Sequence, residues 1–285
     1  MRKGRIGRGI SLAKSSWAVI RSHPSLMLFP VLGSIAGVLA AGLLFAPGIA
    51  VLVADEKLTW VLIPFGLLAA YGLTFVALFF SVGLAACANL ALDGQEVSFG
   101  KGFAVARSRT GVIAGWALVQ LTVGLILNLI QSLLSDQGGV AAIFGAVIQV
   151  IGRLAWAVAS FFVIPILALE GLGPKAALKR SVATIKERWG EGVVGSAAIG
   201  IVTLPAIIIA IALIFGAASL SDSNAPVALA MIAVGVIVFA AAVIFSSSLT
   251  AVFRVALYRF AADGTVTGGF EQQQLESAFV AKKRR

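Results

Sequence analysis

The chain has 285 residues, of which 60% are hydrophobic and only 12% are charged, and its formal net charge is +10. Soluble domains carry about 25% charged residues, so this composition excludes an ordinary soluble protein and indicates a chain whose solvent is lipid. Cys87 is the only cysteine and His23 the only histidine, which excludes an intrachain disulfide and argues against a histidine-based metal site.

The chain begins with a basic segment that precedes the first long apolar stretch. Arg2, Lys3, Arg5 and Arg8 imitate the start of a signal peptide. However, the first apolar run begins only near Leu26 and is too long for the hydrophobic region of such a peptide. We therefore expect this terminus to remain uncleaved.

Six apolar stretches follow, and each exceeds the roughly 20 residues that a helix needs to cross a bilayer. In hydrocarbon every backbone N–H and C=O must be paired within its own segment, which predicts helices. The expected fold is all-α: a polytopic membrane protein with six transmembrane helices as three hairpins, each preceded by a cytoplasmic amphipathic helix. The predicted spans are Leu26–Ala54, Leu58–Leu92, Gly111–Leu134, Val140–Leu169, Gly192–Leu220 and Ala225–Leu257.

The placement of charge predicts the orientation of these spans. Basic residues are concentrated before the first span, in the two long connections and in the tail, whereas the short connections carry Asp55, Glu56, Asp136 and Asp222 with only Lys57 among them. By the positive-inside rule, both termini and both long connections are expected in the cytoplasm. Topology and anionic lipid account for the basic charge, so no nucleic-acid partner is expected.

An internal repeat relates the three predicted hairpins. Apolar residues at helical spacing recur at constant offsets in front of each pair of spans, and basic residues follow the same offsets. We predict one membrane domain over 1–285 with repeat units at about 5–92, 97–169 and 174–262, and a basic cytoplasmic tail over 263–285. Within that tail, Phe270–Val280 is a fourth amphipathic piece of weak register. The recurring apolar positions are Ile6, Ile10, Ala13, Trp17 and Ile20, then Phe99, Phe103, Ala106, Thr110 and Ile113, then Leu178, Val182, Ile185 and Trp189.

Glycine and proline punctuate the spans. Each unit ends on an acidic residue followed by Gly94, Gly171 or Gly264, which predicts a helix end with glycine at the C-terminal cap. Prolines within the apolar runs predict kinks, not ion sites, because polar residues that could coordinate an ion are lacking beside them. These prolines are Pro47, Pro64, Pro165 and Pro205.

The amphipathic segments suggest contact with membrane lipid. Their apolar faces can lie in the headgroup boundary while lysine and arginine reach anionic headgroups. The alternative is that they are ordinary connectors packed on the cytoplasmic ends of the spans. The candidate anionic-lipid contacts are Arg8, Lys14, Lys101, Arg107, Arg109, Arg180, Lys186 and Arg188.

Polar residues inside the spans form one candidate site. Counting residues along the third and fourth spans places Arg153, Gln149, Asn128 and Gln131 at similar depth in the outer leaflet. One interpretation is a cluster that binds an anionic headgroup or solute. The other is that Arg153 extends outward, pairs with Asp136 and stabilises the hairpin.

The stretch IGRLAWAVASFFVIPILALEGLGPKAALKRSVATIKERWGE from Ile151 to Glu191 resembles a bacterial family of integral membrane proteins of unknown function. The N-terminal GRGISLAKSSWAVIRSHPSLMLFP is similar to the start of the same family. This resemblance implies a six-span protein of the bacterial cytoplasmic membrane and carries no catalytic residue. The layout is also similar to the membrane domain that accompanies some glycerophosphodiester phosphodiesterases, without their catalytic domain.

Two functions are compatible with these features. The first is a non-enzymatic scaffold or accessory subunit that binds lipid, a protein partner, or further copies of itself in a homo-oligomer. The second is a transporter or channel for a small or amphipathic solute, against which the sparse intramembrane polarity counts. We expect no enzymatic activity and no cofactor, because the sequence lacks a phosphate-binding loop, a nucleophile with a base, and a metal-ligand cluster.

Overall fold

The computed structural model describes residues 5–54, 62–135, 139–189, 197–218, 224–267, 269–272 and 275–276. Within these ranges the chain is all-α, with no strand. Five segments are long and apolar enough to cross a membrane, and Leu204–Ala217 is a shorter apolar helical stretch. The five segments are Pro24–Val51, Leu62–Leu92, Thr110–Ser135, Ile143–Leu169 and Ala225–Asp263.

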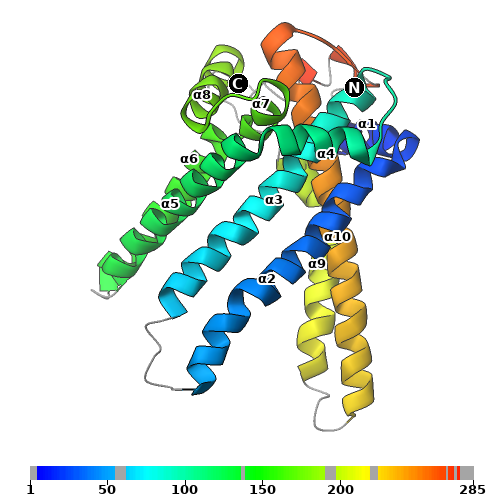
Figure 1. Cartoon of the computed structure of the whole chain (residues 1–285). Coiled ribbons are helices and arrows are strands. Elements are labelled where there is room, and N and C mark those ends of the chain that lie inside the picture. The colour runs from blue at the N-terminus through cyan, green and yellow to red at the C-terminus, as the bar shows by residue number, and fades with distance from the viewer. Residues whose placement is uncertain are drawn as a thin grey trace. The chain divides into compact units, whose positions relative to one another are not determined.

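The helices follow the predicted order (Figure 1). A helix forms at each of the three amphipathic positions, before the apolar helices that follow it. The elements are α1 (Arg5–Ser22), the short helix η1 (Pro24–Met27), α2 (Leu28–Ala54), α3 (Leu62–Leu92), α4 (Phe99–Ser108), α5 (Thr110–Ser135), α6 (Gly139–Ala159), α7 (Val163–Leu169), α8 (Pro174–Trp189), α9 (Ala197–Ala218) and α10 (Ala225–Asp263). The predicted fifth stretch, Gly192–Leu220, corresponds to α9, and α10 extends six residues beyond the predicted Leu257.

The chain divides into two compact units. One consists of Met1–Pro30, Ala88–Val97 and Arg188–Arg285. In it α9 packs along α10, and α1 contacts both helices (Figure 1). At Gly235 the two long helices approach so closely that an added Cβ would lie 2.8 Å from Ile214 Cγ1. Close approach at a glycine is a common way for helices to pack in lipid, where no hydrophobic effect drives them together.

The other unit consists of Val31–Cys87 and Ser98–Glu187. Here α5 packs along α6, with Leu127 against Gly152 and Leu134 against Gly145. These two pairs set the register in which the helices pass each other. Between α2 and α3, Phe80 packs against Gly33 in a similar way.

The predicted fourth span, Val140–Leu169, is not one continuous helix. The structure shows α6 ending at Ala159, a turn over 160–162, and α7 beginning at Val163. Pro165 lies in the first turn of α7, where a missing N–H costs little. The predicted kink is therefore a break, and it lies before the proline.

The backbone groups freed by this break bind one side chain from α8. Ser181 Oγ donates to Ala159 O at 2.7 Å and accepts from Phe162 N at 3.2 Å. Ser181 and Phe162 are both fully buried. Non-helical backbone at membrane depth is tolerated where protein satisfies its polar groups, and Ser181 does this here.

The predicted glycine caps are confirmed. Gly94, Gly171 and Gly264 follow the ends of α3, α7 and α10 and have φ angles of 65°, 65° and 72°. This left-handed conformation is nearly free of strain only for glycine. The three turns thus share a left-handed glycine, although its N–H donates to a carbonyl three, five and four residues back, at Ala91, Ile166 and Phe260.

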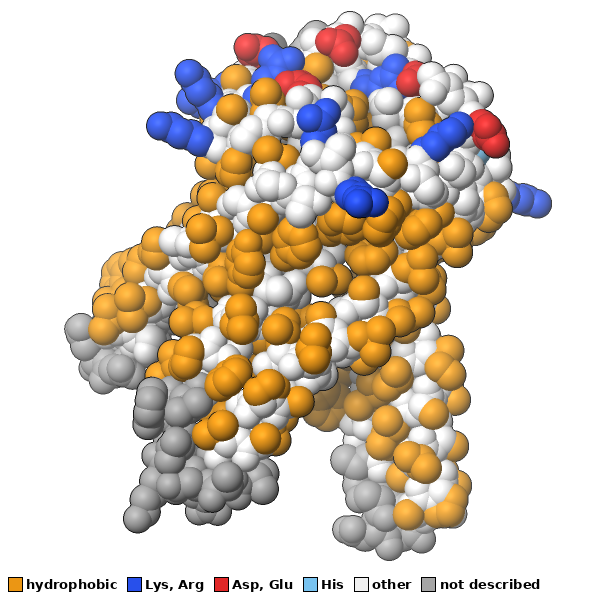
Figure 2. All heavy atoms as spheres, viewed as in Figure 1, with side chains coloured by type: hydrophobic (Ala, Val, Ile, Leu, Met, Phe, Trp, Pro, Cys, Tyr) orange, Lys and Arg blue, Asp and Glu red, His pale blue; other side chains and the backbone are white. Residues whose placement is uncertain are grey.

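Side chains along the long helices are apolar and exposed. Val38, Leu43 and Phe215 are each more than 70% exposed, at 72%, 76% and 74%. On the face drawn in Figure 2, hydrophobic side chains cover the stems of α2, α3 and α10, whereas lysine and arginine lie over α4 and α8. Apolar surface of this extent is stable in lipid and not in water.

Candidate functional site

The intramembrane polar cluster forms between α5 and α6. Asn128 Oδ1 accepts two hydrogen bonds, from Arg153 Nη2 at 2.9 Å and from Gln149 Nε2 at 3.1 Å. Gln149 and Arg153 are one turn apart on α6, so both side chains reach the same point on α5. The amide oxygen of Asn128 thereby organises the cluster.

Gln131 is not part of the observed cluster, and the predicted pairing of Arg153 with Asp136 is not tested. Gln131 lies one turn beyond Asn128 but makes no hydrogen bond to the other three side chains, all of which are described. Its neighbour on α6 is Gly145, where an added Cβ would lie 3.4 Å from the Gln131 carbonyl oxygen. Asp136, the alternative partner of Arg153, lies outside the described residues.

A second polar contact joins α5 and α6 nearer the α4 end. Trp156 Nε1 donates to Gln120 Oε1 at 2.6 Å, and Trp156 stacks on Trp116 with centroids 5.5 Å apart. Trp116 is 1% exposed. Sequence reasoning missed this contact, although a glutamine within an apolar helix is itself a signal of a polar partner. The α5–α6 seam is therefore polar at two levels.

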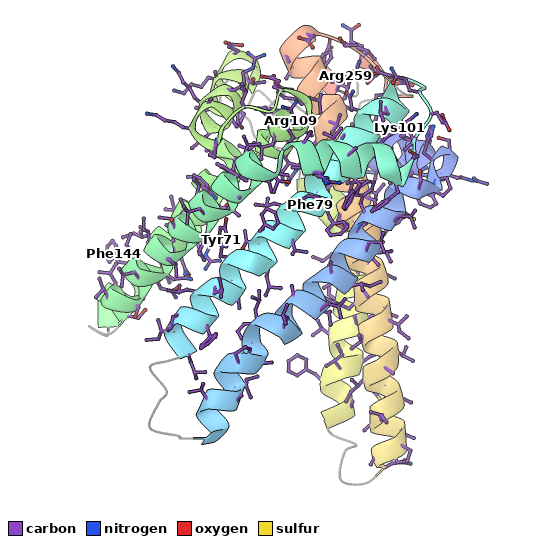
Figure 3. All side chains as sticks on the ribbon, viewed as in Figure 1. Tyr71, Phe79, Lys101, Arg109, Phe144 and Arg259 are labelled. Atoms are coloured by element: carbon purple, nitrogen blue, oxygen red, sulfur yellow. The ribbon has the colours of Figure 1, made fainter. Side chains whose placement is uncertain are left out.

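The basic residues of α4 and α8 lie at one end of this seam. The α4 helix leads through Arg109 into α5, and α8 follows α7 after residues 170–173. The bases are exposed except for Arg109, which is half-buried at the start of α5 (Figure 3). The exposed bases are Lys101 and Arg107 on α4, and Lys175, Lys179, Arg180 and Lys186 on α8. In the other unit Lys14 is also exposed, whereas the side chains of Arg8 and Arg188 lie outside the described residues.

Aromatic rings cluster where α4 meets α3. Phe79 of α3 makes an edge-to-face contact with Phe103 at 5.3 Å between centroids, and Phe103 contacts Phe99 at 5.6 Å. Phe103 is 38% exposed, while Ala106 on the next turn is fully buried. Figure 3 shows Phe79 and Lys101 with the α4 ribbon. This helix carries bases and large apolar side chains on its exposed surface.

Arg109 contacts the turn that ends α7. Its guanidinium lies where a side chain at Gly171 would project, so Gly171 is required for both its positive φ and this contact. Arg109 Nε is buried without a hydrogen-bond partner among the described residues. Two of the predicted lipid contacts are therefore engaged within the chain: Arg109 packs against Gly171, and Arg180 forms a 3.5 Å ion pair with Glu170.

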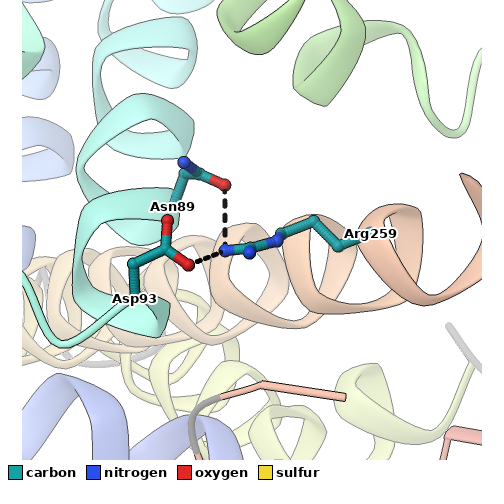
Figure 4. A network of polar contacts seen from close by, with 3 residues as sticks. All are labelled: Asn89, Asp93 and Arg259. Carbon is teal, nitrogen blue, oxygen red and sulfur yellow. Dashed lines mark hydrogen bonds and ion pairs between the residues drawn. The ribbon is translucent and has the colours of Figure 1, made fainter. Parts of the chain in front are cut away.

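A polar network that sequence reasoning missed connects α3 and α10 (Figure 4). Arg259 Nη1 donates to Asp93 Oδ1 at 2.6 Å and to Asn89 Oδ1 at 3.4 Å. The Arg259 and Asp93 side chains are 18% and 27% exposed. Partial burial weakens solvent screening, so this pair should stabilise the unit more than a surface pair does.

We expect a double-mutant cycle on Asp93→Asn and Arg259→Gln to give a coupling energy of about 1 kcal/mol, the upper end for measured exposed pairs. Thermal unfolding of purified protein in detergent measures it. The matched control is the pair Glu170 and Arg180, which is longer at 3.5 Å and more exposed at 32% and 43%. Its coupling should be smaller, and an equal coupling for the two pairs would contradict this account.

The remaining reactive side chains take part in local structure. Cys87 is buried, and its Sγ donates to Ser98 O at 3.3 Å. His23 Nδ1 lies 3.0 Å from Ser22 Oγ. In the described part of the chain, no three His, Cys, Asp or Glu residues are grouped so that they could hold a metal ion.

Comparison with known proteins identifies a family for this chain. Residues 58–269 match DUF6159, described as a family of unknown function. The matched range covers α3 to α10, well over half of the chain, and includes the α5–α6 seam and both basic helices. No curated protein and no solved structure matches the chain. The chain therefore belongs to the DUF6159 family of unknown function.

Proposed function

We propose that this chain is a six-span protein of the bacterial cytoplasmic membrane, with three hairpins and both termini in the cytoplasm. Besides the five long segments, α9 is proposed as the remaining span, fifth in chain order, and its 22 residues suffice for a helical crossing. The basic residues on α4 and α8 support the orientation, because positive residues remain on the cytoplasmic side. The orientation is tested with a reporter that is fused after Arg285 and is active only in the cytoplasm. An inactive reporter would mean that the opposite topology is correct.

We further propose that the protein is a non-enzymatic scaffold or accessory subunit that binds anionic lipid through α4 and α8. The observation that carries this proposal is the set of exposed bases at one end of the apolar α5–α6 pair. Phe99 and Phe103 beside these bases give α4 the composition of a helix at the headgroup boundary. Each lysine or arginine near an anionic surface contributes about 1 kcal/mol.

Lipid retention tests this proposal. The protein is purified in native lipid, and the retained lipids are quantified by mass spectrometry against the bulk membrane. We expect anionic lipids to be enriched around the wild type, and several-fold less enriched around the variant Lys101→Gln/Arg107→Gln/Lys175→Gln/Lys179→Gln.

The matched control removes the same number of charges from the tail: Lys282→Gln/Lys283→Gln/Arg284→Gln/Arg285→Gln. It has the same net charge as the first variant, so a loss specific to α4 and α8 cannot arise from total charge. Equal losses in both variants, or no enrichment around the wild type, would sink the lipid-binding proposal.

A transporter is the second candidate, favoured by the polar cluster of Arg153, Gln149 and Asn128 at membrane depth. Solute-dependent flux in liposomes that is lost in Arg153→Gln would favour it over the scaffold. Flux that is absent, or unchanged in this variant, would leave the scaffold as the function supported best.

A further inference from the structure

Arg153 lies deep within a spanning segment and is exposed. Its segment is Ile143–Leu169, and Arg153 lies about ten residues, or about 15 Å of helix, from the nearer end. The hydrocarbon core is about 30 Å thick, so this position lies well inside it. A charge there is costly unless a partner balances it.

Among the described residues, the side chain that Arg153 contacts is neutral. Its one described hydrogen bond goes to the Asn128 amide oxygen, which Gln149 shares. Among the spanning segments that the structure describes, the only carboxylate belongs to Asp263, the last residue of α10. The contact with Asn128 holds the guanidinium in place, but no described residue compensates its charge, and a single neutral acceptor engages few of its N–H groups.

The surface around Arg153 suits a neighbouring helix. Ala146, Val150 and Ala157 are exposed and lie at helical spacing from Arg153 along α6. Small residues beside a polar one let a second transmembrane helix approach closely enough to form a hydrogen bond. The exposed face of α6 thus combines close packing with one fixed charge.

We infer that Arg153 is the docking point for a transmembrane helix of a different protein, and that this helix carries an aspartate or glutamate within the hydrocarbon. A carboxylate supplies the charge and the two acceptor oxygens that a guanidinium binds best. A second copy of this chain would bring another arginine to the face. A lipid phosphate lies outside the hydrocarbon core, about 15 Å of helix away from Arg153.

This inference deepens the proposed scaffold function by naming the chemistry of the partner, and it rests on membrane insertion of the chain. The probe is a synthetic transmembrane peptide of leucine and alanine with lysine ends and a single glutamate at the depth of Arg153. The reference peptide has glutamine there. Full-length protein and labelled peptide are reconstituted in phosphatidylcholine vesicles, and association is measured by energy transfer.

We expect the glutamate peptide to bind wild-type protein about threefold to thirtyfold more tightly than the glutamine peptide. The ratio should fall to about one in Arg153→Gln and be partly kept in Arg153→Lys. Leu154→Gln is the matched control, because it adds an exposed polar side chain beside Arg153 and should leave the ratio unchanged. Arg153 is exposed, so its variants should fold, which melting temperature and elution volume check.

Four results would overturn the inference. The first two are an affinity ratio of one for the wild type and an affinity ratio that persists in Arg153→Gln. The third is an increase of the affinity ratio by more than tenfold in Asp136→Asn. The fourth is loss of the preference for the glutamate peptide when phosphatidylglycerol is added to the vesicles. The third would show that Asp136 already neutralises Arg153, and the fourth that lipid phosphate occupies the site. If instead the protein does not float with the vesicles, membrane insertion itself is wrong, and with it the proposed function.

Discussion

Replacing Gly171 with alanine is expected to lower the melting temperature of the purified protein by several degrees. The backbone at Gly171 has φ of 65°, which costs an L-residue roughly 1–2 kcal/mol. The new Cβ would also overlap the guanidinium of Arg109, so that side chain must leave its packed position. The two costs add, because one arises from the backbone and the other from packing.

Gly94→Ala separates these two causes. Gly94 has the same φ of 65° and also follows an acidic residue, but no atom lies within 4 Å of its added Cβ. The melting temperature of Gly94→Ala should therefore fall only by the amount that the backbone strain causes. In an Arg109→Ala background, Gly171→Ala should cost no more than Gly94→Ala does. Equal losses for the two glycines in the wild-type background would show that Arg109 does not matter.

Ser181→Ala is expected to have the second large effect. The Ser181 hydroxyl satisfies both the Ala159 carbonyl, at 2.7 Å, and the Phe162 N–H, at 3.2 Å, in a fully buried setting. Leaving a buried polar group unsatisfied costs about 1–3 kcal/mol, and alanine leaves two. Unfolding of the purified protein in detergent, induced by heat or by denaturant, measures the loss of stability.

The control for Ser181 is Ser108→Ala. Ser108 Oγ donates only to Val105 O of its own helix, at 2.8 Å, and is exposed. Its loss should change stability little, because water can replace the bond. A similar loss for Ser108→Ala and Ser181→Ala would mean that the break between α6 and α7 does not depend on the α8 hydroxyl.

The long helices and their glycine caps could be predicted because each depends on local sequence alone. A continuous apolar run requires a helix in lipid, and an acidic–glycine pair marks where it ends. The break before α7 could not be predicted in this way. Phe161 and Phe162 are as apolar as their neighbours, a single serine at 160 is compatible with a helix, and the side chain that stabilises the break, Ser181, lies on another helix.

The polar cluster could be predicted in part from counting residues. Depth increases in proportion to the number of residues along each of two adjacent antiparallel helices. Counting therefore places Asn128 at the level of Gln149 and Arg153, with which it is hydrogen-bonded. Counting does not identify the facing residue at each level, which is why it also predicts Gln131, whose backbone carbonyl lies beside Gly145. The contact of Arg259 with Asp93 joins residues 166 apart, beyond any local pattern.

That separation has a consequence for biosynthesis. The unit containing Arg259 also includes the beginning of the chain and the end of α3, so its segments are made at very different times. At roughly 5–20 residues per second, a ribosome that has made Asp93 needs about 8 to 33 seconds to reach Arg259. During that interval α1 lacks α9 and α10, the two helices that it contacts in the complete unit. Assembly of this unit is thus completed only when the last helix has entered the bilayer.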